Sequence, residues 1–123
     1  MDPTFLVDRF RGCLLGLAVG DALGAPVGGM ARDEVRRRYG RVSAMLPHPQ
    51  LGLGPGAWTD DATMAVLIAR SIAAVGRFDP VDIARRFVAW GLDEPPGIGT
   101  VTRTAIKLLA EGTPWERASY EAH

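Results

Sequence analysis

One hydroxyl and two adjacent carboxylates stand together in the segment Trp58-Thr59-Asp60-Asp61-Ala62-Thr63-Met64. The side chains of Thr59, Asp60 and Asp61 carry hard oxygen donors, which Mg²⁺, Mn²⁺ and Ca²⁺ prefer as ligands. The same residue types also suit a helix start, because Thr59 can cap the first turn and the helix dipole favours acidic residues there. Residue types alone therefore leave a metal site and a capped helix start as alternatives. Three ligands do not complete an octahedral shell, so a metal would need further ligands or water.

The segment after these carboxylates is almost wholly apolar. Between Ala62 and Val75 the polar residues are Thr63, Arg70 and Ser71, which predicts a helix that is apolar around most of its circumference and central in the fold. Its first turn would then lie near the core. Carboxylates in that place must be capped, paired or bound to a cation, because an unpaired buried charge is costly.

A third carboxylate, Asp21, is expected at the end of the first helix, which we predict from about Thr4 to Leu23. The helix dipole disfavours a negative charge at that end. We therefore expect Asp21 either to support the metal site through a hydrogen bond or to be a satisfied turn carboxylate. Gly12, Gly16 and Gly20 recur every four residues on one stripe of this helix, and we expect that stripe to pack closely against the central helix.

The remaining pattern predicts four more helices and no convincing strand, so the fold class is all-α. We expect a short helix from about Arg32 that ends at Gly40. After the central helix come a helix capped by Asp79 and followed by Gly91, a helix from Thr100 to near Gly112, and a capping box at Thr113-Pro114-Trp115-Glu116. Residues 41–57 are rich in Gly and Pro and are expected to form a loop in which His48 is exposed.

A further candidate site lies where the helix at Thr100 begins. Gly97-Ile98-Gly99-Thr100 precedes that helix, and free backbone amides at such a start can hold a phosphate or a carboxylate. Gly97, Gly99 and Thr100 are thus candidate substrate-binding residues. An ordinary capped loop is the alternative.

Two longer motifs carry a resemblance to a known family. The stretch Arg11-Gly12-Cys13-Leu14-Leu15-Gly16-Leu17-Ala18-Val19-Gly20-Asp21-Ala22-Leu23-Gly24-Ala25-Pro26 is followed by the Trp58-Thr59-Asp60-Asp61 segment. In this order and spacing they resemble the amino-terminal part of the ADP-ribosylglycohydrolase family, which includes the dinitrogenase-reductase-activating glycohydrolase. Gly97 to Arg103 and Thr113 to Glu116 also resemble later segments of that family, so the similarity runs over nearly the whole chain.

The resemblance implies an all-α hydrolase, a truncated multi-helical array of which residues 1–123 form the amino-terminal part of a single domain. Members of the ADP-ribosylglycohydrolase family use a two-metal site, with Mg²⁺ or Mn²⁺, to cleave the glycosidic bond that joins ADP-ribose to a modified side chain. Thr59, Asp60 and Asp61 match the family's first set of metal ligands, Asp60 and Asp61 are the implied catalytic residues, and Trp58 stands at the edge of the site. The implied substrate is an ADP-ribosylated protein or a small ADP-ribose derivative.

The chain departs from the family pattern in two places. The family's second set of ligands is an Asp-x-Asp-Ser/Thr motif, and no Asp-x-Asp occurs in this sequence. The chain would then carry half of the metal site and be inactive alone. The family also commonly has a Glu where this chain has Gly28. Glu34 could replace it only if the loop folded differently.

Composition excludes several classes of partner. Lys plus Arg equals Asp plus Glu at 14 each, so no net charge attracts nucleic acid or an anionic membrane. The acidic start lacks the pattern of a signal peptide, and the glycines, Asp21 and Pro26 argue against a membrane span, so we expect a cytoplasmic protein. Cys13, the sole cysteine, is expected to be a buried, inert thiol.

Two classes of function remain. One is the metal-dependent glycohydrolase, and the other is a non-catalytic all-α module that binds a nucleotide or a partner. Because a central helix that is apolar all round needs neighbours on every side, we expect uncovered apolar surface. That surface would favour self-association or a complementary carboxyl-terminal chain.

Overall fold

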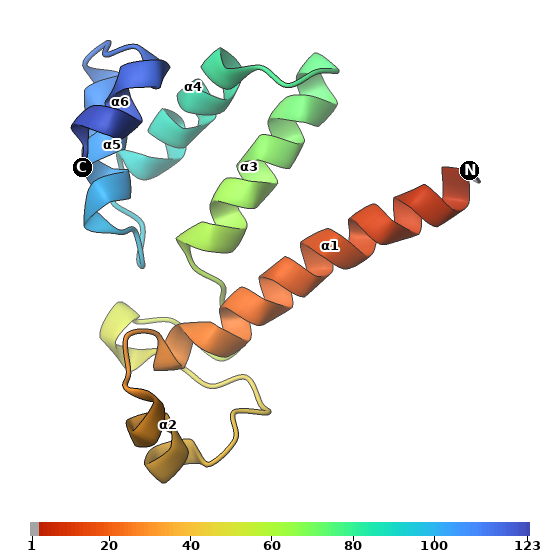
Figure 1. The fold of residues 1–123 in the computed structure, drawn as a ribbon, viewed down its shortest axis with the longest axis vertical. Helices are drawn as coiled ribbons and strands as arrows, with labels where there is room; N and C mark the ends of the chain where they lie inside the picture. The colour runs from red at the N-terminus through yellow and green to blue at the C-terminus, as the bar shows by residue number, and fades with distance from the viewer. Residues whose placement is uncertain (1–2) are drawn as a thin grey trace. The chain divides into compact units, whose positions relative to one another are not determined.

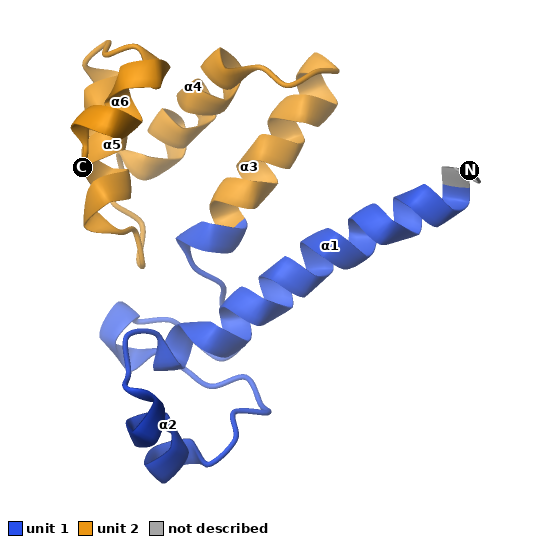
Figure 2. Cartoon of the chain, in the orientation of Figure 1, with its two compact units in different colours: residues 1–62 blue, residues 63–123 orange. Residues whose placement is uncertain are grey.

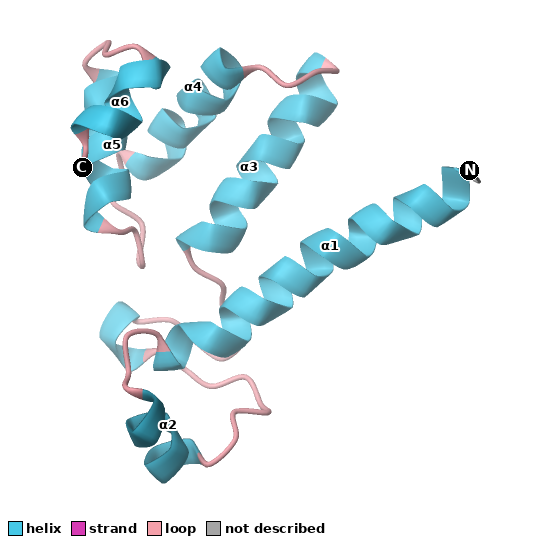
Figure 3. Cartoon of the chain, viewed as in Figure 1, coloured by secondary structure: helices cyan, strands magenta, loops and turns pink. Residues whose placement is uncertain are grey.

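The computed structural model describes residues 3–123, and within that range it is all-α, as the sequence predicts (Figures 1 and 3). Six α-helices and two short 3₁₀ segments follow one another, and no strand occurs in the described part of the chain. In order they are α1 (Pro3–Gly24), η1 (Ala25–Val27), α2 (Arg32–Tyr39), η2 (Pro49–Leu51), α3 (Asp60–Val75), α4 (Pro80–Gly91), α5 (Thr100–Ala110) and α6 (Trp115–Glu121).

The chain divides into two compact units, residues 1–62 and residues 63–123 (Figure 2). The boundary falls just after the first turn of α3. The first unit therefore contains α1, α2 and the start of α3, and the second contains the rest of α3 with α4, α5 and α6.

In the first unit the glycine stripe of α1 has no packing partner. Gly12, Gly16 and Gly20 lie inside the helix, yet a Cβ built on any of them would meet nothing within 4 Å. The prediction of close packing is therefore wrong for this unit. The helix forms because Leu and Ala between the glycines favour it. Within the unit its carboxyl end contacts η1 and, through Asp21, the start of α3.

Large apolar side chains of α1 are exposed as a consequence. Phe5, Phe10 and Leu15 are 50%, 62% and 65% exposed, and Cys13 is exposed rather than buried. The prediction of uncovered apolar surface concerned α3, and α1 exposes such surface as well. The stretch Thr4–Val27 also has the length and apolar composition of a membrane span, contrary to the sequence argument, because the glycines do not interrupt the helix. Length and composition alone do not distinguish a span from the core helix of a larger fold.

In the second unit α5 packs against both α4 and α6. The buried side chains come from all three helices and from the loop before α5: Ile83, Ile98, Ile106 and Ala118. Asp79 caps α4 by accepting hydrogen bonds from the amides of Val81 and Asp82. The prediction of this cap and of Pro80 at the first helical position is confirmed.

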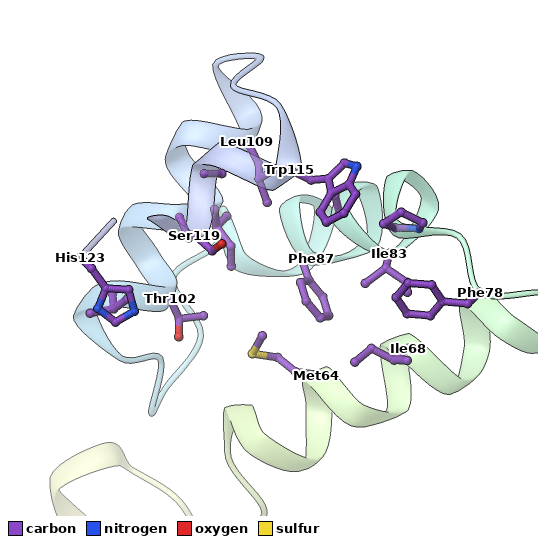
Figure 4. Close-up of a pocket in the computed structure, with 16 residues that line it drawn as sticks. Met64, Ile68, Phe78, Ile83, Phe87, Thr102, Leu109, Trp115, Ser119 and His123 are labelled. Carbon is purple, nitrogen blue, oxygen red and sulfur yellow. The ribbon is translucent and has the colours of Figure 1, made fainter. Parts of the chain in front are cut away.

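The apolar helix α3 is not central in this unit. It lines one side of a cavity of about 400 Å³, whose other walls come from α4, α5 and α6. Figure 4 shows Met64 and Ile68 of α3 pointing toward the side where Phe87 and Phe78 lie. Most α3 side chains between Thr63 and Ala69 are only half-buried, so the prediction of a central helix is wrong for the second unit.

Two helix ends differ from prediction. Gly91 is the last residue of α4 instead of the first residue past its end, and it is buried where α5 comes close: a Cβ there would overlap the side chain of Ile106. The predicted capping box at Thr113 does not form. The helix α6 begins at Trp115, one residue later than expected, and no side chain caps it.

Candidate functional site

Asp21 at the end of α1 caps the start of α3 across a long sequence separation. Its Oδ2 accepts hydrogen bonds from the backbone amides of Thr59, at 2.9 Å, and Ala62, at 3.0 Å. Its Oδ1 accepts a third bond, at 2.7 Å, from the hydroxyl of Thr59. The amides and the hydroxyl together offset the unfavourable position of a carboxylate at the end of α1. Of the two sequence alternatives for Asp21, the structure places it in a hydrogen-bonded supporting position and not in a local turn.

These bonds fix the orientation of the Thr59 hydroxyl. Because its proton is donated to Asp21, the lone pairs of Oγ1 point away from that bond. A hydroxyl can serve a cation only through those lone pairs. The bond to Asp21 thus fixes the direction in which the Thr59 hydroxyl proton points.

Asp60 and Asp61 occupy the first turn of α3. Asp60 is half-buried and Asp61 is exposed. The pKa of Asp61 is raised above its ordinary value, first by partial desolvation and then by the negative charges of Asp60 and Asp21. The nearby negative charges of Asp60 and Asp21 thus make the ionised form of Asp61 less favourable.

The donor set fits one side of a site for a divalent cation. Thr59, Asp60 and Asp61 offer one hydroxyl and two carboxylates, all hard oxygen donors. Within residues 3–123, however, no three His, Cys, Asp or Glu side chains converge closely enough to hold a metal ion by themselves. Any ion bound here would take its remaining ligands from water or from groups outside this set.

The other predicted site residues lie elsewhere or have different surroundings. Trp58, which the resemblance implies at the edge of the site, is 48% exposed. Gly97, Gly99 and Thr100 belong to the second unit, where Gly99 precedes α5 and no side chain caps the helix start. The helix start predicted at Thr100 is confirmed.

The first unit has a cavity of its own, and the loop at Gly28 borders it. This cavity, of about 490 Å³, is bounded by the loop after η1, by α2 and by residues 46–50. Gly28, Gly29, Glu34 and His48 all line it. The sequence predicted an exposed His48, but the residue is half-buried and its ring Nδ1 is buried with no hydrogen-bond partner among residues 3–123.

One polar cluster was not foreseen. The fully buried hydroxyl of Ser71 donates a 2.7 Å hydrogen bond to Asp82, and Arg86 donates a 2.6 Å bond to the same carboxylate oxygen. The two donors, Arg86 first, hold the pKa of Asp82 below its ordinary value. A serine among apolar residues of a helix was the available signal, because a buried hydroxyl needs a partner. The cluster joins α3 to α4.

Comparison with known proteins identifies the family. The sequence profile of the ADP-ribosylglycohydrolase family matches residues 1–122. The chain belongs to the ADP-ribosylglycohydrolase family. The resemblance carried by the Gly-Asp-Ala and Trp-Thr-Asp-Asp motifs is thereby confirmed.

The chain is similar to curated proteins over most of its length. An uncharacterized protein of Archaeoglobus fulgidus is 44% identical over 90% of the chain, and the ADP-ribosyl-[dinitrogen reductase] glycohydrolase of Rhodospirillum rubrum is 42% identical over 86%. The ADP-ribosylarginine hydrolase Tri1 of Pseudomonas putida is 35% identical over 94%. The chain spans about a third of the length of these relatives, 37%, 36% and 32%.

Proposed function

We propose that this chain supplies the amino-terminal part of a metal-dependent hydrolase that removes ADP-ribose from a modified protein or another acceptor. Family membership supports the reaction class. The names of two relatives support an ADP-ribosylated substrate. The observation that carries the proposal is the set of hydrogen bonds by which Asp21 orients Thr59 beside Asp60 and Asp61.

In this proposal Thr59, Asp60 and Asp61 hold one side of a site for Mg²⁺ or Mn²⁺. When bound, the two metal ions would orient the ribose and lower the pKa of a water molecule. The chain's own residues would position the Thr59 hydroxyl and balance the charge at the helix start. Asp21 keeps the Thr59 hydroxyl donating away from the cation, and the carboxylates of Asp60 and Asp61 supply negative charge at a helix start that would otherwise repel a cation.

The 123-residue chain alone is expected to bind the metal weakly and to be inactive, because it offers one side of the site only. Mn²⁺ titration followed by NMR line broadening tests this. Broadening should centre on the amides of Asp60 and Asp61 and should be lost in Asp60→Asn, which keeps a good helix-start residue. Glu116→Gln, in the first turn of α6, is the matched control.

Two results would contradict the proposal. Equal Mn²⁺ broadening in Asp60→Asn and the unsubstituted chain would remove Asp60 from the site. Hydrolysis of an ADP-ribosylated protein by the purified chain, abolished by a chelator, would show that no second half is required. A non-catalytic nucleotide-binding module is the other candidate, and it predicts ADP-ribose binding that Asp60→Asn leaves unchanged.

A further inference from the structure

The cavity beside α2 has the composition of a small-molecule site. Its volume of about 490 Å³ lies within the range of ligand pockets, which combine apolar walls with a few polar groups. The apolar walls are Pro26, Met30, Leu46, Pro47 and Pro49, and the polar side chains are Glu34, Arg38, Tyr39, His48 and Gln50.

Two opposite charges on the cavity wall are not paired with each other. Glu34 and Arg38 stand four residues apart on α2, the spacing at which such residues usually form an ion pair. Neither has an ion-pair partner in the described part of the chain. The guanidinium of Arg38 lies instead over the ring of Tyr39, 5.5 Å from its centroid. The carboxylate and the guanidinium are thus both available to a ligand.

A third group in this wall also lacks a partner. The Nδ1 atom of His48 is buried without a hydrogen bond among residues 3–123, although buried polar atoms are nearly always satisfied by protein or solvent. Three polar groups with unused bonding capacity therefore face one small cavity or border it.

The charge pattern selects the class of ligand. A simple anion would be attracted by Arg38 and repelled by Glu34, and a simple cation would meet the reverse. A zwitterion satisfies both. The β-carbons of residues four apart on a helix are about 5–6 Å apart, which suits a molecule whose ammonium and carboxylate are close together. A free α-amino acid carries both groups on one carbon, whereas a peptide carries them at opposite ends of its chain.

We propose that this cavity binds a free α-amino acid, with its carboxylate at Arg38, its ammonium at Glu34 and an apolar side chain against Met30 and Leu46. Binding requires neither a metal ion nor hydrolysis. The proposal therefore does not depend on the proposed function, and either can fail alone.

Chemical-shift titration of the full 123-residue chain tests it with matched probes. L-leucine and L-phenylalanine carry both charges, L-leucinamide lacks the carboxylate, and 4-methylpentanoate lacks the ammonium. Leucine or phenylalanine should shift the amide signals of Met30, Leu46 and His48. L-leucine should bind about tenfold more tightly than either singly charged analogue, the ratio expected from one charge-assisted hydrogen bond.

Two substitutions assign the charges to the residues. Glu34→Gln should bind L-leucine no better than 4-methylpentanoate, and Arg38→Gln should bind L-leucine no better than L-leucinamide. Glu116→Gln, outside the cavity, should keep both preferences. The proposal is overturned if neither amino acid shifts the cavity amides. It is also overturned if Glu34→Gln still prefers L-leucine to 4-methylpentanoate and Arg38→Gln still prefers L-leucine to L-leucinamide. Unchanged signals outside the cavity establish that each variant is folded, and the two variants test the site independently.

Discussion

Removing the Asp21 carboxylate should destabilise the start of α3. Asp21→Ala deletes the acceptor of three hydrogen bonds, two from backbone amides and one from the Thr59 hydroxyl. Bonds to a charged acceptor contribute about 1.5–3 kcal/mol each, and they are not additive. Because Asp21 and Thr59 are only half-buried, we take the low end and expect a loss of about 3 kcal/mol.

Asp21→Asn separates the geometry from the charge. One amide oxygen can still accept from the two backbone amides, but the Asn side-chain nitrogen would face the Thr59 hydroxyl, which must then accept instead of donate. We expect a smaller loss, about 1–2 kcal/mol. In the proposed enzyme the reversed hydroxyl would also turn its lone pairs away from a cation, so Mn²⁺ binding should weaken even where stability is largely kept.

Amide hydrogen exchange measures the effect at the site itself. In Asp21→Ala the amide of Ala62 should exchange about a hundredfold faster, which corresponds to about 3 kcal/mol. Asp93→Asn is the control, because Asp93 is exposed and makes no hydrogen bond or ion pair within residues 3–123. Equal protection of Ala62 in Asp21→Ala and Asp93→Asn would refute the view that Asp21 caps α3.

Three further predictions concern packing and charge elsewhere. In Gly91→Ala the new methyl group overlaps Ile106, so the free energy of unfolding measured in urea should fall by about 1–3 kcal/mol. Adding Ile106→Val to this variant removes the overlapping Cδ1 and should restore much of the lost stability; a loss that it leaves unchanged would mean that the contact is not the cause. Gly16→Ala should stabilise the chain by about 0.8–1 kcal/mol in thermal unfolding, because nothing lies within 4 Å of a Cβ there; destabilisation would reveal a packed stripe. The folded-state pKa of Asp82 lies below its ordinary value of 3.8, so its contribution to stability is present above that value and lost as the pH falls through the folded pKa. In urea unfolding, the loss of stability between pH 7 and pH 3 should therefore be smaller in Asp82→Asn than in the unsubstituted chain, and an equal loss would contradict the assignment.

Local signals in the sequence predicted the helical elements well. Asp79 and Pro80 indicate the start of α4. Gly40 ends α2 with a φ of 67°, a backbone conformation that glycine adopts without strain. The candidate site was also accessible from sequence, because Thr59, Asp60 and Asp61 are contiguous and chemically distinctive. Such features depend on neighbouring residues only, so no tertiary information is needed to find them.

Contacts between distant residues were decided by tertiary structure. The glycines of α1 and the apolar face of α3 both indicate burial, yet spacing cannot tell whether a partner is present, and within the units none covers them as predicted. Gly91 was predicted just past the end of α4 and is its last residue, and only the structure shows that Ile106 leaves no room there for a side chain. Periodicity identifies which face of a helix is apolar. It carries no information on what packs there.

The sequence by itself determined that this chain is helical, that it belongs to a family marked by two acidic motifs, and where its candidate metal-ligating oxygens stand. Only the tertiary structure brought Asp21 to Thr59 across 38 residues and gathered Glu34, Arg38 and His48 around one cavity. The physical reason is that backbone propensities and caps act within a few residues. A hydrogen bond or a cavity between distant segments exists only once the intervening chain has folded and closed the loop.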